Sequence, residues 1–223
     1  MLLLAGDTSG KHGSIALARG NADGSCDVID VVPLAGGTFS AQLVPQIAAL
    51  LAKHGFAKTD IGAFVVASGP GSFTGLRVGL AAIKALAEIL EKPIAAVSLL
   101  EVVALAGGLQ GRVVAALDAG RGEIYAGEYD VAGESASLVR ERLLTRSEFV
   151  AEMKACSVVT PDSALGTIAG DAGVVVTTID PISAAEIAGL GWRKIQSGSI
   201  VSPEQLEANY IRRSDAEIFA KQL

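Results

Sequence analysis

Apolar residues follow two alternating patterns along the chain. Short, nearly continuous apolar runs of about four to eight residues predict buried strands, whereas apolar residues at every third or fourth position predict helices. Close spacing of the first three runs indicates antiparallel hairpins. The predicted strands are Leu2–Gly6, Ser14–Ala18, Cys26–Val32, Phe64–Ala67, Ile94–Val97, Arg112–Leu117, Glu123–Val131, Ser137–Leu144 and Val174–Thr177.

Helical periodicity marks four main stretches, and several residues at their ends are typical of helix starts and stops. Pro45 lies inside the first stretch and is expected to kink or restart that helix, because proline lacks an N–H group. Pro93 is expected to stop the second. Glu148 behind Thr145, and Glu186 behind Ser183, are typical of capped N-termini. The predicted helices are Phe39–His54, Thr74–Glu91, Leu99–Ala106 and Ser183–Ile195.

Each half of the chain opens with a strand that ends in an aspartate followed by a glycine-containing turn. The first is Asp7-Thr8-Ser9-Gly10 and the second is Asp118-Ala119-Gly120. This weak repeat predicts two related lobes, with the boundary near Gly107–Gly111. We therefore expect an N-terminal lobe over 1–107 and a C-terminal lobe over 108–223.

Composition restricts the partners and the chemistry. The net charge is −6 without a basic stripe, so direct nucleic-acid binding is not expected and any nucleic-acid contact should be made through a partner. Cys26 and Cys156 are far apart, which favours reduced cytoplasmic thiols. Two histidines, His12 and His54, argue against an imidazole-based metal site. No signal peptide or membrane span is predicted.

The stretch Thr74–Glu91 is uncharged over most of its circumference. One stripe is apolar, a narrow stripe is charged, and a third consists mostly of small residues at Gly75, Gly79, Ala82 and Leu86, with Val78 beside it. Small residues at this spacing allow a second helix to approach closely. Two partners remain open, namely the helix Phe39–His54 of the same chain and another subunit.

The glycine-rich loop before this helix admits two interpretations. A loop between a strand and a helix can bind phosphate at the helix N-terminus. It can equally be a tight turn with Ser72 or Thr74 as N-cap. It is not a P-loop, because the Gly-Lys-[Ser/Thr] ending is missing.

The two aspartate turns are candidate nucleotide or phosphate loops. Asp7 with Thr8 and Ser9, and Asp118 with Gly120, could face one another across a cleft and hold a metal-bound water or a phosphate. The alternative is that each aspartate ends a strand and bonds its own turn. Residues 118–125 also contain Arg121 and Glu123, which suggest either an internal ion pair or a site. No nucleophile elbow or zinc motif is present.

Residues 69–79 (GPGSFTGLRVG) closely resemble the signature of the TsaB (YeaZ-like) proteins of bacterial tRNA threonylcarbamoyladenosine synthesis. Residues 4–9 are similar to the first strand and turn of that family, and residues 118–125 to its second-lobe segment. Residues 209–212 and 214–217 resemble its C-terminal tail. The chain departs from the usual pattern at Gly6 and Gly120, where that family has Ile and Arg; the second glycine slightly favours a nucleotide contact.

The resemblance implies an α/β, two-lobed actin/sugar-kinase-like (ASKHA, ribonuclease H-like) fold. It also implies a non-catalytic subunit that pairs with a TsaD-type catalytic subunit through N-lobe helices, forms a homodimer when alone, and works with a TsaE-type ATPase. The metal histidines of the catalytic relative are replaced by Phe39, Gln42, Leu43 and Gln46, so no metal and no cofactor are expected, apart from a possible ATP or ADP contact in the assembled complex. The residues expected at the interface are Phe39, Leu43, Gln46, Leu50, Gly75, Val78, Gly79, Ala82 and Leu86.

Two other functions compete with this interpretation. One is an ATP-dependent phosphotransferase or nucleotide-binding protein that uses Asp7 and Asp118. The other is a metalloprotease, suggested by the glycoprotease-like name of the wider family and disfavoured by the missing metal ligands.

Overall fold

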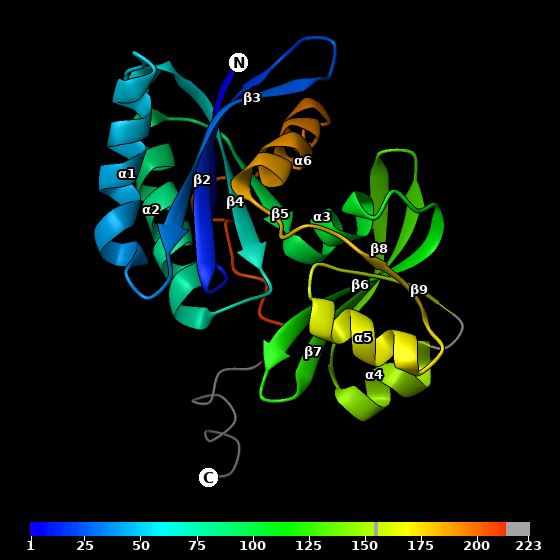
Figure 1. Ribbon diagram of the computed structural model, residues 1–223. Coiled ribbons are helices and arrows are strands. Elements are labelled where there is room, and N and C mark those ends of the chain that lie inside the picture. The colour runs from blue at the N-terminus through cyan, green and yellow to red at the C-terminus, as the bar shows by residue number, and fades with distance from the viewer. Residues whose placement is uncertain (154–155, 213–223) are drawn as a thin grey trace. The chain divides into compact units, whose positions relative to one another are not determined.

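The computed structural model describes residues 1–153 and 156–212, which form two compact units (Figure 1). The first unit comprises Met1–Ser98 and Ser183–Asn209. The second comprises Leu99–Ile182 together with the described residues from 210 to 212. The division therefore differs from the predicted boundary near residue 107, because the chain returns to the first unit late in the sequence.

The first unit is built on a five-stranded mixed sheet with the order β3-β2-β1-β4-β5. Strands β1, β2 and β3 are antiparallel neighbours, as predicted, while β4 and β5 run parallel to β1. The bounds are β1 Leu2–Asp7, β2 His12–Gly20, β3 Cys26–Ala35, β4 Ile61–Gly69 and β5 Ile94–Ser98.

The second unit repeats this plan. Its sheet has the order β10-β9-β6-β7-β8, with β6, β7 and β8 antiparallel and with β9 and β10 parallel to β6. The duplicated topology confirms the α/β class and the repeat that the two aspartate turns suggested. The bounds are β6 Gly111–Gly120, β7 Glu123–Ala132, β8 Ser135–Thr145, β9 Ser157–Thr160 and β10 Val175–Thr178.

The helices also repeat, one after each of the last three strands of a unit. They are α1 Phe39–Lys53, α2 Phe73–Leu90, α3 Leu99–Ala106, α4 Arg146–Glu152, α5 Ser163–Asp171 and α6 Ala184–Gln196, with a 3-10 turn at Lys58–Asp60. Strand β9, helix α5 and the 3-10 turn were not predicted from the sequence. Strand β9 is only four residues long, and α5 contains Gly166 and Gly170, which weaken helical propensity.

Helices α3 and α6 exchange sheets. Helix α3 follows the last strand of the first sheet but packs on β6, β7, β8 and β9, whereas α6 follows the second sheet and packs on β1 to β5. This exchange explains why the units divide at Ser98/Leu99 and again at Ile182/Ser183. The glycine-rich stretch Gly107–Gly111, from which the boundary was predicted, gives no sign of this exchange.

The first sheet is consequently covered on both faces (Figure 1). Helices α1 and α2 pack side by side on one face, and α6 covers the other. The core between the sheet and the helix pair contains Leu4, Phe64 and Leu76, each at most 1% exposed. Within the described residues, no helix is both long and apolar enough to cross a membrane.

The helix ends largely follow the sequence signals. Thr145 with Glu148, and Ser183 with Glu186, form capping boxes at α4 and α6. Helix α2 ends at Leu90, before Pro93 as predicted, with Glu91 in the left-handed conformation. Pro45 lies inside α1, which continues as one helix from Phe39 to Lys53.

Two glycines in α6 offer a matched test of how closely this helix packs on the sheet. A Cβ atom on Gly191 would lie 2.1 Å from Cγ1 of Val65, whereas one on Gly189 would meet nothing within 4 Å. We expect Gly191→Ala to lower the free energy of unfolding by about 1–3 kcal/mol through overpacking. Gly189→Ala should raise it by about 0.5–1 kcal/mol, because alanine restricts the unfolded chain.

Urea unfolding followed by the fluorescence of Trp192, which is buried in the same helix, measures both changes. Equal effects of the two substitutions would contradict the close α6–sheet contact.

Candidate functional site

The turn after β1 is locked against the start of α2. Thr8 Oγ1 donates a hydrogen bond to the Gly75 carbonyl oxygen at 2.7 Å, and Ser72 N donates to the Ser9 carbonyl oxygen at 2.7 Å. A Cβ atom on Gly75 would lie 2.0 Å from the Thr8 carbonyl oxygen, and one on Gly79 would lie 2.3 Å from Thr8 Oγ1. The Thr8 turn can therefore lie this close to α2 only because residues 75 and 79 have no side chain.

One of the two helix partners left open by the sequence is present, since α1 packs beside α2. At Gly75 and Gly79 themselves, however, the close neighbour is the Thr8 turn and not a second helix. Both glycines are buried. A helical wheel shows which residues share a face and cannot show what covers that face.

The glycine-rich loop matches the second of its two interpretations, a tight turn with a serine N-cap. The Ser72 side chain accepts a hydrogen bond from Gly75 N, and the Gly69–Pro70 peptide bond is cis. A Cβ atom on Gly71 would lie 2.5 Å from the Ser9 carbonyl oxygen. The absence of a side chain at Gly71 thus lets the loop lie against the turn after β1. The Ser72 N–H group already donates its hydrogen bond to the Ser9 carbonyl oxygen.

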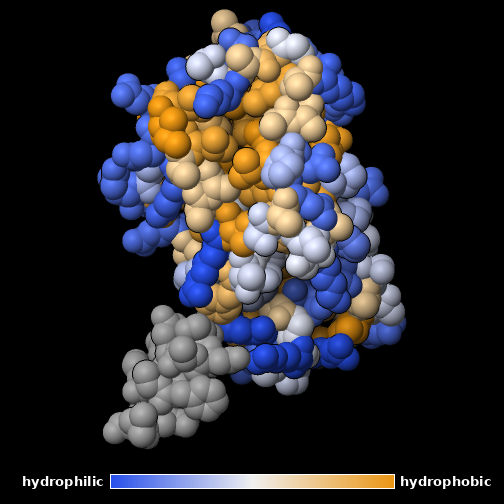
Figure 2. Space-filling view, turned by 90° about the vertical axis from the view of Figure 1, so that its left-hand side faces the viewer, coloured by the Kyte–Doolittle hydropathy of each residue, from blue (hydrophilic) through white to orange (hydrophobic). Residues whose placement is uncertain are grey.

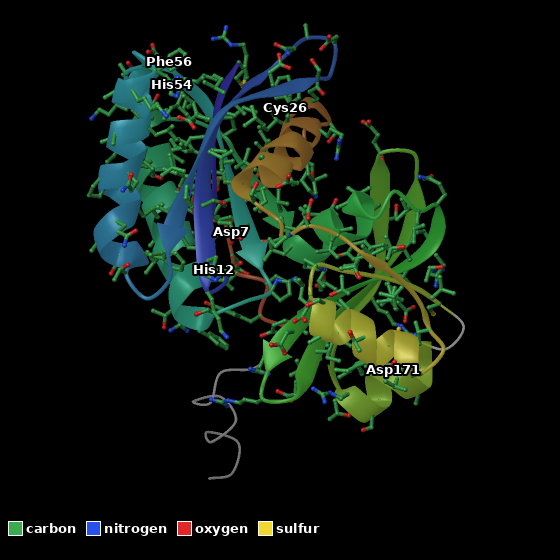
Figure 3. The ribbon with its side chains drawn as sticks, viewed as in Figure 1. Asp7, His12, Cys26, His54, Phe56 and Asp171 are labelled. Carbon is green, nitrogen blue, oxygen red and sulfur yellow. The ribbon has the colours of Figure 1, made fainter. Side chains whose placement is uncertain are left out.

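Asp7 is a buried carboxylate at the C-terminal end of β1 (Figure 3). Its Oδ1 accepts a hydrogen bond from Ser9 N at 2.8 Å. Burial raises the pKa of Asp7, because the ionised form loses its hydration, and the bonds from Ser9 offset this only partly. Ionising this side chain in the folded state is therefore unfavourable, and such a perturbed acid is a candidate functional residue.

Asp118 differs from Asp7 in its surroundings. Asp118 is exposed, and its Oδ1 accepts a hydrogen bond from Gly120 N at 2.9 Å, as expected for an aspartate that caps its own turn. Residues Gly120, Arg121 and Gly122 all have positive φ, at 71°, 58° and 79°. Asp7 and Asp118 lie in different units, so the proposed pairing of the two stays a prediction.

The β6–β7 turn is tied to the chain tail by an ion pair that the sequence analysis did not foresee. Arg212 pairs with Glu123, donates to the Gly120 carbonyl oxygen at 3.3 Å, and stacks 5.9 Å from the centre of the Tyr125 ring. The expected partner of Glu123 was a residue of its own turn. The tail motif at 214–217 lies outside the described residues.

The histidines lie at opposite ends of the first sheet (Figure 3). His54 Nε2 is 2.8 Å from Asp30 Oδ2, and Lys53 Nζ is 2.7 Å from the same oxygen. These contacts, His54 first, lower the pKa of Asp30 to about 2. His12 is exposed at the start of β2. Among residues 1–153 and 156–212, no group of three His, Cys, Asp or Glu residues is arranged to hold a metal ion.

The outward surface of α1 and α2 is mostly apolar (Figure 2). Val44 is 54% exposed and Ile89 is 72% exposed. We call this surface the helix-pair face. Its exposed or half-exposed members are Ala41, Val44, Pro45, Ala48, Ala49 and Ala52 on α1, and Val78, Ala81, Ala82, Ala85, Leu86 and Ile89 on α2.

The helix-pair face only partly coincides with the interface residues expected from the sequence. Gln46, Val78, Ala82 and Leu86 are half-exposed on this side of the unit. The remaining expected residues are buried in the core of their own unit, so their contact with a partner stays a prediction. These are Phe39, Leu43, Leu50, Gly75 and Gly79.

Replacing Asp7 tests how much the burial of its ionisable group lowers the stability of the folded state. Because the folded state raises this pKa above 3.8, the stability that Asp7 contributes is complete below pH 3.8 and is lost as the pH rises through the folded pKa. Asp7→Asn keeps an acceptor for Ser9 N and cannot ionise. We therefore expect Asp7→Asn to melt at a higher temperature than the wild type at pH 7, with the difference shrinking toward pH 3.8.

Thermal unfolding at several pH values measures this difference. The control is Asp118→Asn, at an exposed carboxylate, which should change stability by less than about 1 kcal/mol at every pH. Lower stability of Asp7→Asn at pH 7 would contradict the assigned cost.

Comparison with known proteins gives consistent matches. The family model described as TsaD: tRNA N6-adenosine threonylcarbamoyltransferase matches residues 31–156. The tRNA threonylcarbamoyladenosine biosynthesis protein TsaB of Bacillus subtilis is 37% identical over 130 residues, covering 58% of this chain and 55% of the relative. TsaB of Escherichia coli is 35% identical over 133 residues, with the same two shares. The chain thus matches about half the length of these curated relatives.

A solved structure matches over most of the chain. YeaZ from Pseudomonas aeruginosa superimposes with a TM-score of 0.75 at 26% identity, covering 94% of this chain and 99% of that one. Together with the duplicated sheets, this match confirms the predicted actin/sugar-kinase-like fold. The family model includes α1 and α2 as well as the glycine-rich loop, so the chain belongs to the threonylcarbamoyltransferase family and, within it, to the TsaB (YeaZ-like) proteins.

Proposed function

We propose that this chain acts in tRNA threonylcarbamoyladenosine synthesis as a non-catalytic subunit that pairs with a TsaD-type catalytic subunit through the helix-pair face. The names of its relatives support the assignment of the chain to this process. The helix-pair face supports the role, and it is the observation that carries the proposal.

The helix-pair face exposes apolar side chains to water, which is energetically unfavourable. On α1, the residues facing solvent between Ala41 and Ala52 are apolar, apart from half-exposed Gln42 and Gln46 at its margin. Contiguous exposed apolar surface of this kind typically marks a protein–protein interface. Small side chains such as Ala48 and Ala81 allow another pair of helices to approach closely.

A paralogue is the partner that best fits this surface. The TsaD family model spans residues 31–156 and therefore includes both helices of the face. A catalytic subunit built on the same plan presents its own helix pair in the same place, and two such pairs can form a four-helix contact related by an approximate two-fold axis. By the same geometry, we expect the isolated chain to form a homodimer.

Sequence and charge support an indirect role in the reaction. The sequence contains two histidines, and His54 is engaged by Asp30, so an imidazole-based metal site like that of the catalytic relative would lack ligands. The net charge of −6 disfavours direct tRNA binding. We therefore assign tRNA binding to the catalytic partner and expect a TsaE-type ATPase as a further component.

Charge placed on the helix-pair face tests the pairing. We expect Val44→Glu and Ala48→Glu to fold normally, because both positions are exposed, and to weaken binding of the TsaD-type subunit at least 100-fold, because a carboxylate would be buried unpaired. Sizing chromatography and calorimetry of the two purified subunits measure the effect. The control is Leu138→Glu, at an equally exposed apolar residue of β8, which is 56% exposed.

Wild-type binding by both face variants would contradict the proposal, as would failure of the wild-type chain to bind the catalytic subunit.

One observation favours a second candidate function, a nucleotide-binding or phosphotransferase activity of the chain itself. Asp7 is a buried acidic side chain whose pKa is raised by burial, and perturbed pKa values are common at functional sites. This candidate predicts that the isolated chain binds Mg·ATP and that Asp7→Asn abolishes the binding. Calorimetry with Mg·ATP in the absence of any partner distinguishes it from the subunit role.

A further inference from the structure

The turn after β1 contacts the buried side of α2 over the first two turns of this helix. Thr8 is 4% exposed, and its hydroxyl group donates to the Gly75 carbonyl oxygen. Gly75 and Gly79 are four positions apart, so they lie on the same side of the helix, and Thr8 is the closest neighbour of both. Thr8 therefore supports, from inside the unit, a helix whose outer side belongs to the helix-pair face.

One stripe of small residues on α2 leads from Thr8 to the helix-pair face. Gly79 is buried against Thr8, whereas Ala82, three positions later, and Leu86, four positions further on, are half-exposed members of the face. Val78 precedes Gly79 in the chain and is also half-exposed on the face. Because the helix is rigid over one turn, the contact of Gly79 with Thr8 determines how far Val78 and Ala82 project from the unit.

Thr8 and α2 leave no room for a side chain between them. A Cβ atom on Gly79 would lie 2.3 Å from Thr8 Oγ1 but 3.5 Å from Thr8 Cβ, so the hydroxyl oxygen is the obstacle. Rotation of the Thr8 side chain would break its hydrogen bond to Gly75, and a β-branched side chain has few alternative rotamers. A side chain at position 79 therefore either breaks this bond or displaces α2 outward.

The turn is itself fixed to the centre of the first sheet. Strand β1 lies between β2 and β4, and Asp7 at its end accepts a hydrogen bond from Ser9 N at 2.8 Å. Ser9 in turn accepts a hydrogen bond from Ser72 N at 2.7 Å, next to the start of α2. The turn thus links the position of the sheet to the position of the helix.

The helix-pair face cannot adapt easily to a displaced helix. Alanine is its commonest residue, as at Ala48, Ala81 and Ala85, and alanine has no side-chain rotamer that could change to fill a gap. The core of a protein–protein interface is packed as densely as a protein interior. A shift of α2 relative to α1 would therefore reduce the fit to a docked protein.

We propose that Thr8 is a positioning residue for the helix-pair face, which sets the affinity for the catalytic partner by holding α2 at the correct distance from the sheet. The proposal rests on the proposed function. Thr8 acts through Gly75 and Gly79 from the buried side of α2, so its effect on binding needs no contact with the partner.

A double-mutant cycle tests this role by calorimetric binding of the purified TsaD-type subunit. We expect Gly79→Ala to weaken binding about 10-fold, because its methyl group displaces α2. Thr8→Ala loses the hydrogen bond to Gly75 and should weaken binding about 3-fold. Thr8→Ala/Gly79→Ala lacks the obstructing oxygen and should also bind about 3-fold more weakly than the wild type, whereas independent effects would give about 30-fold.

Gly191→Ala is the matched control, because it overpacks α6 against the opposite face of the same sheet. It should lose stability and still bind as the wild type. All variants are compared at a temperature well below their thermal midpoints, where each is folded.

Independent effects in the cycle would overturn the positioning role alone. A loss of affinity in Gly191→Ala as large as that in Gly79→Ala would do the same, because lowered stability would then explain both. Failure of the wild-type chain to bind the catalytic subunit would overturn the proposed function as well.

Discussion

Contact between the Thr8 turn and the glycines of α2 determines where α2 lies on the first sheet. The Thr8 oxygen atoms occupy the volume where side chains at Gly75 and Gly79 would otherwise stand. Helix α2 therefore buries the side that bears Leu76, Leu80 and Ile83 against the sheet. Its orientation then leaves Ala81, Ala85 and Ile89 facing outward beside α1.

The outward side of the helix pair follows from this packing. Helix α1 buries Phe39, Leu43 and Leu50, so its apolar residues on the other side have no partner within the unit. The opposite face of the sheet is closed by α6, whose Gly191 allows close approach to Val65. The fold thus completes its own core and still leaves apolar surface on one side, and that surface carries the proposed pairing with a paralogue.

Local patterns in the sequence predicted most of the strands, the four longer helical stretches and several caps. Ser183 and Thr145 were recognised because capping requires only neighbouring residues. The interface residues were predicted less well, because small and apolar residues on a helix serve core and surface alike. The wheel grouped Gly79 with Ala82, and only the Thr8 contact shows that the first is buried while the second is half-exposed.

Long-range contacts account for the remaining differences. The ion pair of Glu123 with Arg212 joins residues 89 positions apart, and no local pattern indicates it. The burial of Asp7 likewise depends on how the whole unit packs around β1. The unit boundary differed for the same reason, since the exchange of α3 and α6 is a property of packing and not of composition.

That exchange has a consequence for synthesis on the ribosome. Strands β1 to β5 emerge early, but one face of their sheet stays bare until α6, near residue 190, has been translated. The amino-terminal unit therefore cannot mature ahead of the carboxy-terminal one, in contrast to chains whose domains fold one after another as they emerge. During that interval the nascent chain exposes the apolar side of its first sheet to water.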